Sequence, residues 1–196
     1  MISAILLAAG TSSRMGNKNK LLLSWNGEPM IRHVARQLVA VPVDEILVVL
    51  GHEADKVKEA LEGLPARFTT NHQFASGMTS SIQAGVAALS PQSEAFFVCL
   101  GDMPLLTSAH YAALIRFFEE RKKTCAAPIV RPVNGDRKGH PVLFDAAYVP
   151  NILDCREQEG CREVIRNNQG RFFAFQVNDE AYYRDVDGKE DYLRAI

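Results

Sequence analysis

Two glycines, three hydroxyl side chains and three cations lie in one short segment of this sequence, directly after an apolar run. The apolar run covers residues 2–8, and the polar segment extends from Gly10 to Lys20. Its chemically notable side chains are Gly10, Thr11, Ser12, Ser13, Arg14, Gly16, Lys18 and Lys20. Glycine lets backbone amides approach a ligand closely. Arginine can bind two phosphate oxygens at once, and lysine supplies a point charge. The segment therefore predicts a loop that binds a polyanion through its phosphates.

The predicted loop follows neither of the common phosphate-binding patterns. In the Walker pattern, Gly10 and Gly16 would be one residue closer together, and a lysine rather than Asn17 would follow Gly16. The dinucleotide pattern G-x-G-x-x-G is also absent. An ordinary strand-to-helix loop with solvated cations is the alternative interpretation.

Carboxylates at two places are candidate metal ligands. Asp102 follows the most apolar run of the chain, residues 95–100. Mg²⁺ binds proteins through one or two carboxylates and takes its other ligands from phosphate and water. Asp185 and Asp187 alternate along a predicted strand and so share a face, with Asp187 nearer the strand end. Helix capping by Asp102 and a plain surface turn at Asp187 are the alternatives.

Gly77, Ser80 and Ser81 precede or open a helix predicted over residues 79–89. Free amides at a helix N-terminus favour an anion or a polar sugar edge, and Asn71 can reach the same place. Helix capping, with Ser80-x-x-Gln83 as a capping box, also explains the serines. The two roles are compatible.

Residues 7–20 resemble the signature of nucleotidyltransferases that consume a nucleoside triphosphate and release pyrophosphate. The matching positions are Leu7, Ala8, Ala9, Gly10, Ser12, Arg14, Met15, Gly16 and Lys20. Within this group, the sequence is most similar to the molybdenum cofactor cytidylyltransferases and their molybdopterin nucleotidyltransferase relatives. Four later segments, residues 77–82, 101–104, 138–141 and 185–187, occur in the family's order, so the resemblance covers essentially the whole chain.

The resemblance implies a Rossmann-like three-layer α/β/α sandwich with a mostly parallel sheet, of the nucleotide-diphospho-sugar transferase type. It implies catalytic roles for Arg14, Lys20 and Asp102, and a Mg²⁺ ion held by Asp102 and Asp187. Nucleotide-binding positions are then Leu7, Ala8, Ala9, Gly10, Ser12, Ser13, Arg14, Lys20, Asn71, Gly77, Ser80 and Ser81. Gly139 and His140 face the second substrate, with a structural role for His140 equally open. Gly-Lys at positions 188–189 replaces the family's usual Thr-Pro, which leaves the geometry at Asp187 open.

The implied substrates are CTP and molybdenum-molybdopterin, with a molybdoenzyme or its maturation chaperone as a further partner. The acceptor phosphate can attack the α-phosphorus of CTP directly, so no protein nucleophile is expected, and the sequence contains no G-x-S-x-G elbow. Guanylyltransferase relatives tend to have glycine at position 9. The methyl group of Ala9 narrows the pocket and favours cytosine, by about 1–3 kcal/mol.

Three alternatives stay open. One is guanylyl transfer, or cytidylyl transfer to a sugar phosphate or an alditol phosphate, on the same fold. Another is a non-catalytic, nucleotide-binding accessory protein that delivers a cofactor to a molybdoenzyme. The last is a structural α/β domain with a solvated basic loop.

Composition narrows the class of protein. The length of 196 residues and the 47% hydrophobic content suit a single domain over residues 1–196. The net charge of −1 gives no reason to expect nucleic-acid or anionic-membrane binding. No membrane span or signal peptide is evident, so we expect a cytoplasmic protein. The cysteines, at positions 99, 125, 155 and 161, form no metal-binding or disulfide pattern, and Cys99 and Cys125 are expected to pack in strands.

Strands and helices are predicted to alternate. Strands are expected at residues 2–7, 45–50, 66–70, 95–100, 125–130, 141–144 and 172–177. Helices are expected at residues 29–39, 54–61, 79–89, 108–122, 146–154 and 160–167, with a last one after Lys189 and an exposed loop at residues 131–139. This alternation predicts βαβ units around a mostly parallel sheet. Such sheets bind ligands at the carboxyl ends of their strands, so the segments 10–20, 71–81 and 101–104 should converge on one crevice.

Overall fold

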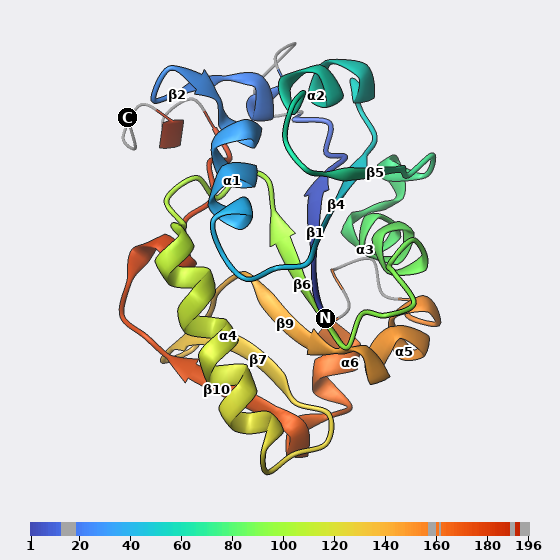
Figure 1. Ribbon diagram of the computed structural model, residues 1–196, viewed down its shortest axis with the longest axis vertical. Helices are drawn as coiled ribbons and strands as arrows, with labels where there is room; N and C mark the ends of the chain where they lie inside the picture. The colour runs from blue at the N-terminus through green and yellow to red at the C-terminus, as the bar shows by residue number, and fades with distance from the viewer. Residues whose placement is uncertain (13–18, 157–159, 161, 189–190, 193–196) are drawn as a thin grey trace.

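A sheet of eight strands forms the middle layer of the molecule (Figure 1). The computed structural model describes residues 1–12, 19–156, 160, 162–188 and 191–192. The main path of the sheet is β10-β7-β9-β6-β1-β4-β5, and β8 pairs with β7. Its strands are β1 (Ile2–Ala8), β4 (Glu45–Leu50), β5 (Arg67–Thr70), β6 (Ala95–Leu100), β7 (Ile129–Asn134), β8 (Arg137–Lys138), β9 (Val142–Asp145) and β10 (Phe172–Gln176). A separate small ribbon consists of β2 (Ser24–Trp25) and β3 (Glu28–Pro29).

Helices cover both faces of the sheet, as the sequence predicts. The α-helices are α1 (Met30–Val39), α2 (Ala54–Ala60), α3 (Met78–Ala87), α4 (Ser108–Lys122), α5 (Val149–Leu153) and α6 (Arg162–Arg166). The 3-10 turns are η2 (Lys20–Leu22), η3 (Phe74–Ser76), η4 (Ala146–Tyr148), η5 (Gln169–Arg171) and η6 (Glu180–Tyr182). In the described part of the chain, no helix combines the length and the apolar character that a membrane crossing requires.

The central strand β1 shows why two helical layers form. Its side chains alternate between the faces of the sheet, as in any strand. Leu6 and Ala8 pack in the core beneath α1, α2 and α4, whereas Ile5 and Leu7 pack in the core beneath α3, α5 and α6. Figure 1 shows α1 and α4 in front of the sheet. A strand that is buried on both faces needs the continuous apolar run seen in the sequence.

Successive strands of the chain are added first on one side of β1 and then on the other. This strand pairs in parallel with β4 on one side and with β6 on the other. The chain first extends the sheet from β1 through β4 to β5, and then returns to add β6 on the opposite side. Ligands of open α/β sheets bind at such reversals, beyond the carboxyl ends of the strands.

The region around β7 differs from the prediction. The strand begins at Ile129 and extends to Asn134, so residues 131–139 form a hairpin of β7 and β8 rather than an exposed loop. Arg131 is buried within β7, where its guanidinium group bonds to carbonyl oxygens of the hairpin. Cys125 lies before the strand and is half-buried rather than packed within it. Paired polar residues can form a hairpin, which hydrophobicity alone does not reveal.

The start of α3 also differs from the prediction. The helix begins at Met78, so Ser80 lies inside its first turn and does not cap it. The side chain of Gln83 instead donates hydrogen bonds to carbonyl oxygens at and just beyond the end of α5. The expected capping box is therefore wrong. The N-cap residue is Gly77, whose φ of 111° is a conformation that favours glycine.

The start of α4 agrees with the prediction. Thr107 is its N-cap residue, and the Thr107 N–H donates to Nδ1 of His110 at 2.8 Å. The helix expected after Lys189 lies mostly outside the described residues.

Candidate active site

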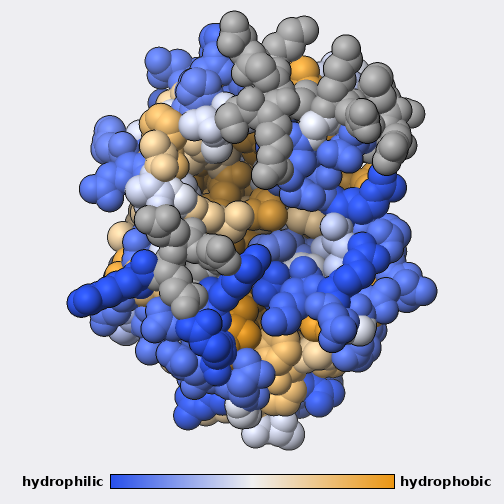
Figure 2. Space-filling model, turned by 180° about the vertical axis from the view of Figure 1, so that it is seen from behind, coloured by the Kyte–Doolittle hydropathy of each residue, from blue (hydrophilic) through white to orange (hydrophobic). Residues whose placement is uncertain are grey.

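A cleft of about 720 Å³ opens at the carboxyl ends of β1 and β6. Figure 2 shows a hollow with apolar residues at its centre and hydrophilic residues around it. The cleft is lined by Leu7, Ala9, Gly10, Thr11, Ser12, Lys20, Leu21, Phe74, Ala75, Gly77, Met78, Ser81, Leu100, Gly101, Asp102, Asp185 and Asp187. The expected convergence of three loops on one crevice is therefore confirmed.

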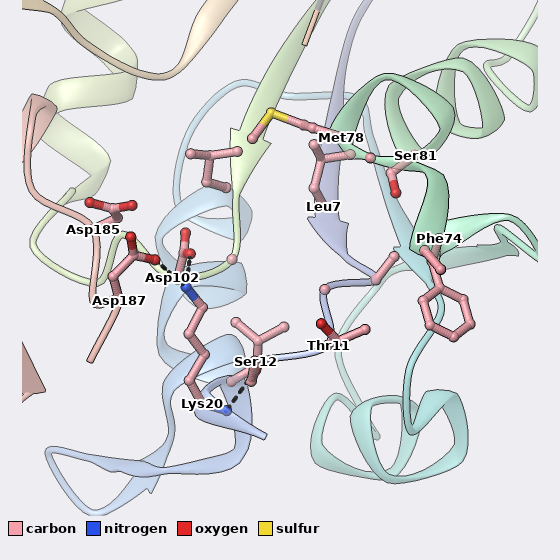
Figure 3. Close-up of a pocket in the computed structure, with 17 residues that line it drawn as sticks. Leu7, Thr11, Ser12, Lys20, Phe74, Met78, Ser81, Asp102, Asp185 and Asp187 are labelled. Carbon is pink, nitrogen blue, oxygen red and sulfur yellow. Dashed lines mark hydrogen bonds and ion pairs between the residues drawn. The ribbon is translucent and has the colours of Figure 1, made fainter. Parts of the chain in front are cut away.

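One end of the cleft is charged (Figure 3). Carboxylate oxygens of Asp102, Asp185 and Asp187 lie within 4.8 Å of one another. Nζ of Lys20 lies 2.5 Å from Oδ2 of Asp102 and 2.9 Å from Oδ1 of Asp187. The lysine thus bridges two carboxylates that come from distant parts of the chain.

Buried neighbours hold the three carboxylates in place. The N–H of Val186 donates to the carbonyl oxygen of Asp102 at 2.8 Å, which ties the C-terminal segment to the end of β6. The side chain of Val186 is buried in a small apolar cluster, and its neighbours Asp185 and Asp187 line the cleft. The expected shared face of Asp185 and Asp187 is confirmed, although residues 185–187 form no strand with a neighbour.

A glycine at position 101 brings the end of β6 close to β1. A Cβ atom built on Gly101 would lie 2.9 Å from the carbonyl oxygen of Leu7 and 2.7 Å from Cδ1 of Ile31. The N–H of Gly101 donates to the same Leu7 oxygen at 3.1 Å. A larger residue would force the strands apart, so this glycine helps to place Asp102 at the edge of the cleft.

The charged groups perturb one another. Burial raises the pKa of Asp185, and the negative charges of Asp102 and Asp187 raise it further. Burial alone would lower the pKa of Lys20, but the same two aspartates outweigh it, so that pKa is raised above 10.5. Among the described residues, three carboxylates surround one ammonium group at this end of the cleft. This set of oxygen donors fits a hard divalent cation.

The opposite end of the cleft is mostly apolar. Figure 3 shows Leu7, Met78 and Phe74 there, together with the hydroxyl group of Ser81. The ring centroid of Phe74 lies 6.3 Å from that of His52, outside the lining. Aromatic and aliphatic side chains beside a single hydroxyl can enclose a flat, polar-edged ring such as a nucleobase.

Asn71 and Ser80 shape the apolar end without lining it. The amide nitrogen of Asn71 donates to the hydroxyl oxygens of Ser80 and Ser81 at 2.9 and 3.0 Å. The amide oxygen of Asn71 accepts the N–H of Gln73 at 2.8 Å. The hydroxyl of Ser80 lies 2.8 Å from the carbonyl oxygen of Gly77, to which it can donate. These bonds hold the turn before α3 against the first residues of the helix. Gly77, at the end of the turn, and Ser81, in the helix, both line the cleft.

Most sequence-predicted nucleotide positions meet at the cleft. Those that line it are Leu7, Ala9, Gly10, Ser12, Lys20, Gly77 and Ser81, and the predicted metal ligands Asp102 and Asp187 line it as well. Ala8 does not, because strand alternation places its side chain in the core beneath α1. Ser13 and Arg14 lie outside the described residues.

Gly139 and His140 lie away from the cleft. His140 lines a second cavity of about 310 Å³. Gly139 is buried, and a Cβ atom there would lie 2.6 Å from the carbonyl oxygen of Tyr182. Met78 lines both cavities, so the second cavity adjoins the apolar end of the cleft.

Several lining residues were not predicted as nucleotide contacts. Thr11 lies in the predicted polyanion-binding loop, and this position could have identified it as a lining residue. Phe74 and Met78 carry no motif, and they line the cleft because η3 and α3 are folded over the end of β1. Asp185 was predicted to share a face with Asp187, and its place in the carboxylate cluster required the tertiary fold.

The chain belongs to the MobA-like NTP transferase domain family, whose family model matches residues 4–172. It is therefore a nucleotidyltransferase of that family, as the sequence resemblance implied. It is 28% identical over 197 residues to nicotine blue oxidoreductase of Paenarthrobacter nicotinovorans, with 100% of this chain and 96% of that protein covered. It is 30% identical over 168 residues to the bifunctional protein GlmU of Brevibacillus brevis, with 84% of this chain but only 36% of GlmU covered.

Solved structures share the whole fold. A nucleotidyl transferase from Methanothermobacter thermautotroptrophicus superposes with a TM-score of 0.85 at 23% identity, covering 100% of this chain and 95% of that one. Rv0371c of Mycobacterium tuberculosis, in complex with manganese, gives a TM-score of 0.78 at 20% identity, with 98% and 96% covered. The architecture is that of the nucleotide-diphospho-sugar transferases, which confirms the predicted fold class.

Proposed function

We propose that this nucleotidyltransferase acts as a single domain over residues 1–196. It transfers CMP from CTP to the terminal phosphate of molybdenum-molybdopterin and releases pyrophosphate. The observation that carries this proposal is a single cleft with two different ends. One end is apolar and edged by Ser81, and the other contains Lys20 and three aspartates. A nucleoside triphosphate has the same division between a flat base and a polyanion.

Asp102 and Asp187 are the proposed ligands of Mg²⁺, with Asp185 beside them. Their oxygen atoms are close enough to share one ion, and Mg²⁺ prefers carboxylate oxygen and water. When bound, Mg²⁺ supplies positive charge that offsets the charge of the nucleotide phosphates. In the part of the chain that the structure describes, Lys20 forms ion pairs with two of these carboxylates, Asp102 and Asp187.

Lys20 and the polar loop are proposed to bind the triphosphate. Gly10, Thr11 and Ser12 line the cleft, and their backbone amides are proposed to bind phosphate oxygens. The guanidinium group of Arg14 is proposed as a second cation. An oxygen of the acceptor phosphate forms a new bond to the α-phosphorus, and the bond between that phosphorus and the α–β bridging oxygen breaks. Pyrophosphate leaves with the bonding electron pair, and the cations stabilise its charge.

Ser81 is proposed to help select the base. Its hydroxyl oxygen accepts a hydrogen bond from Asn71, which leaves its proton to donate. Cytosine presents acceptors at O2 and N3 to such a donor. Leu7 and Phe74 would flank the ring, and the buried methyl group of Ala9 limits the space for a purine.

The test is pyrophosphate release with Mg²⁺ and each of CTP, GTP, ATP and UTP. Molybdenum cofactor serves as acceptor, with sugar phosphates as parallel acceptors. Release with CTP and molybdenum cofactor, lost in Asp102→Ala, is the expected result. Preference for GTP, or turnover only with a sugar phosphate, would replace the proposed substrates with an alternative on the same fold. Nucleotide binding without turnover on any acceptor would favour a non-catalytic accessory protein.

A second candidate is an oxidoreductase. The full-length similarity to nicotine blue oxidoreductase favours it, because both chains are covered almost completely. The same cleft would then hold a dinucleotide reductant. Oxidation of NADH or NADPH in the presence of a quinone-like dye, without pyrophosphate release from any NTP, would establish this activity instead.

A further inference from the structure

The second cavity contains a buried positive charge. Arg131 lines it and is only 7% exposed. Its Nε donates to the carbonyl oxygen of Gly139 at 2.8 Å, and Nη2 donates to that of Lys138 at 3.4 Å. Both partners are uncharged, and among the described residues no carboxylate lies within ion-pair distance of Arg131. A buried guanidinium group is costly unless its charge is balanced. Because none of the described residues supplies a counterion, an anion from outside would be stabilised here.

Two more groups give the cavity its chemistry. Arg162 of α6 also lines it, so a second guanidinium group lies near the first. Burial, followed by the charge of Arg162, lowers the pKa of Arg131 to about 10. Burial and the two arginines lower the pKa of His140 to about 3, so its ring is neutral near pH 7. Within the described part of the chain, the buried Nδ1 of His140 has no hydrogen-bond partner.

The remaining walls of the cavity are apolar. They come from β6, β9, α3 and α6 and comprise Ile82, Val98, Val142, Phe144 and Ile165. The space of about 310 Å³ is enough for a one- or two-ring group. The walls therefore suit a flat apolar body, and the arginines suit a negative charge attached to it.

The cavity is separate from the place of phosphate transfer. Among the described residues, the linings of the two cavities have Met78 alone in common, and Lys20 and the three aspartates line only the cleft. Because Met78 lines both, the two cavities adjoin each other. A ligand could therefore place one end in each.

We propose that the second cavity binds an anionic group carried on a flat, apolar part of the acceptor substrate, remote from its reacting phosphate. Arg131 and Arg162 bind the anion, and the neutral ring of His140 donates a hydrogen bond to the same anionic group. The identification of this ligand with the acceptor rests on the proposed function. The anion site itself does not.

Two matched probes test the site. 1-Naphthoate carries a negative charge on a two-ring body, and 1-naphthalenemethanol has the same body without the charge. Isothermal titration should give tighter binding of the anion. Arg162→Gln should weaken naphthoate binding by about tenfold or more and change binding of the alcohol by less than about twofold, because a charge-assisted bond is lost. Arg166→Gln, in the same helix but outside the cavity lining, should leave both values unchanged.

The results of these titrations distinguish binding of the probe in the second cavity from binding in the cleft. Naphthoate binding should persist when CTP and Mg²⁺ are saturating. Competition with CTP would overturn the proposal, because the probe would then occupy the cleft. Equal binding of the two probes, no binding of naphthoate, or an equal loss in Arg162→Gln and Arg166→Gln would overturn it as well. CTP binding by Arg162→Gln shows that the variant is folded, and failure of nucleotidyl transfer in the wild type would leave the naphthoate result unaffected.

Discussion

At the scale of single residues, Lys20 has two possible sets of partners. It bridges Asp102 and Asp187 in the structure, and the proposed function requires it to contact phosphate oxygens as well. A hard cation among the carboxylates would take over the role of neutralising them. The two roles of Lys20 would then be compatible, because the proposed metal ion and triphosphate would occupy the cleft together.

Asp102→Asn should abolish most of the transferase activity while it preserves the size of the side chain. We expect kcat/KM for CTP to fall by about a hundredfold or more, because the substituted amide is a poor ligand for Mg²⁺ and cannot balance the ammonium of Lys20. Pyrophosphate release measures the change. The matched control is Asp136→Asn, in an exposed turn, which should keep wild-type rates. Wild-type kinetics in Asp102→Asn would remove Asp102 from the reaction.

Asp185→Asn should stabilise the metal-free protein in a pH-dependent way. Because the pKa of Asp185 is raised in the folded state, the folded protein binds the proton of this carboxyl group more tightly than the unfolded chain does. Its contribution to folding stability therefore falls as pH rises from about 3.8 through the raised folded-state pKa. The substitution should raise the free energy of unfolding near pH 7. The gain should be less than about 1 kcal/mol, because Asp185 is only partly shielded from solvent, which screens its charge.

Urea unfolding in EDTA measures this effect. The gain in Asp185→Asn should disappear near pH 2.5, where the wild-type carboxyl group is protonated in both the folded and the unfolded state. An equal gain at both pH values would contradict the electrostatic explanation.

At the scale of elements, the turn before α3 forms the apolar end of the cleft. Gly77 takes a positive φ, and the hydrogen bonds of Asn71 hold the turn between β5 and α3. Neither effect depends on hydrophobic packing. The geometry of the apolar end of the cleft therefore depends on a few polar contacts around the buried side-chain amide of Asn71.

Asn71→Ala should weaken the fold and the affinity for nucleotide together. The variant loses two hydrogen bonds to serines and leaves the N–H of Gln73 without its partner, which should cost about 1–3 kcal/mol of unfolding free energy. The KM for CTP should rise more than kcat falls, because Asn71 positions Ser81 but does not touch the phosphates. Urea unfolding and initial rates measure the two effects.

Asn134→Ala is the control for this substitution. Asn134 makes an exposed hydrogen bond to Asn178, far from the cleft, and its removal should leave the KM for CTP unchanged. A lower kcat with an unchanged KM in Asn71→Ala would show that the turn acts on the reaction rather than on binding.

At the scale of the whole molecule, the cleft joins segments that are distant in sequence. The loop after β1, the turn before α3, the end of β6 and residues 185–187 all contribute to it. A ligand that contacts all four should stabilise the folded state as a unit. Binding should therefore be visible as a change in global stability.

CTP with Mg²⁺ should raise the melting temperature by about 5–10 °C when CTP is present at about a hundred times its Kd. Differential scanning fluorimetry measures the shift. GTP, ATP and UTP at the same concentration should give smaller shifts, EDTA should reduce the CTP shift, and Asp102→Asn should show little of it. Equal shifts with all four nucleotides would contradict the proposed selectivity for cytosine.

The sequence alone determined the layered fold and the charged end of the cleft. Apolar runs that alternate with amphipathic segments define buried strands and covering helices, which is a local property of the chain. The polar loop at residues 10–20 and the aspartate after β6 lie at strand ends, and parallel strands bring such ends to one edge of the sheet. The predicted Lys20, Asp102 and Asp187 are indeed brought together there.

Only the tertiary structure decided the rest, because those contacts join residues without any local signal. Phe74 and Met78 reach the cleft through the folding of η3 and α3 over β1. Arg131 and His140 form a cavity only once β7, β9 and α6 have packed together, although their sequence is that of a polar loop. Hydrophobic patterns determine which side chains are buried. The placement of a polar side chain depends on the neighbours that satisfy its charge and hydrogen bonds, and these come from elsewhere in the chain.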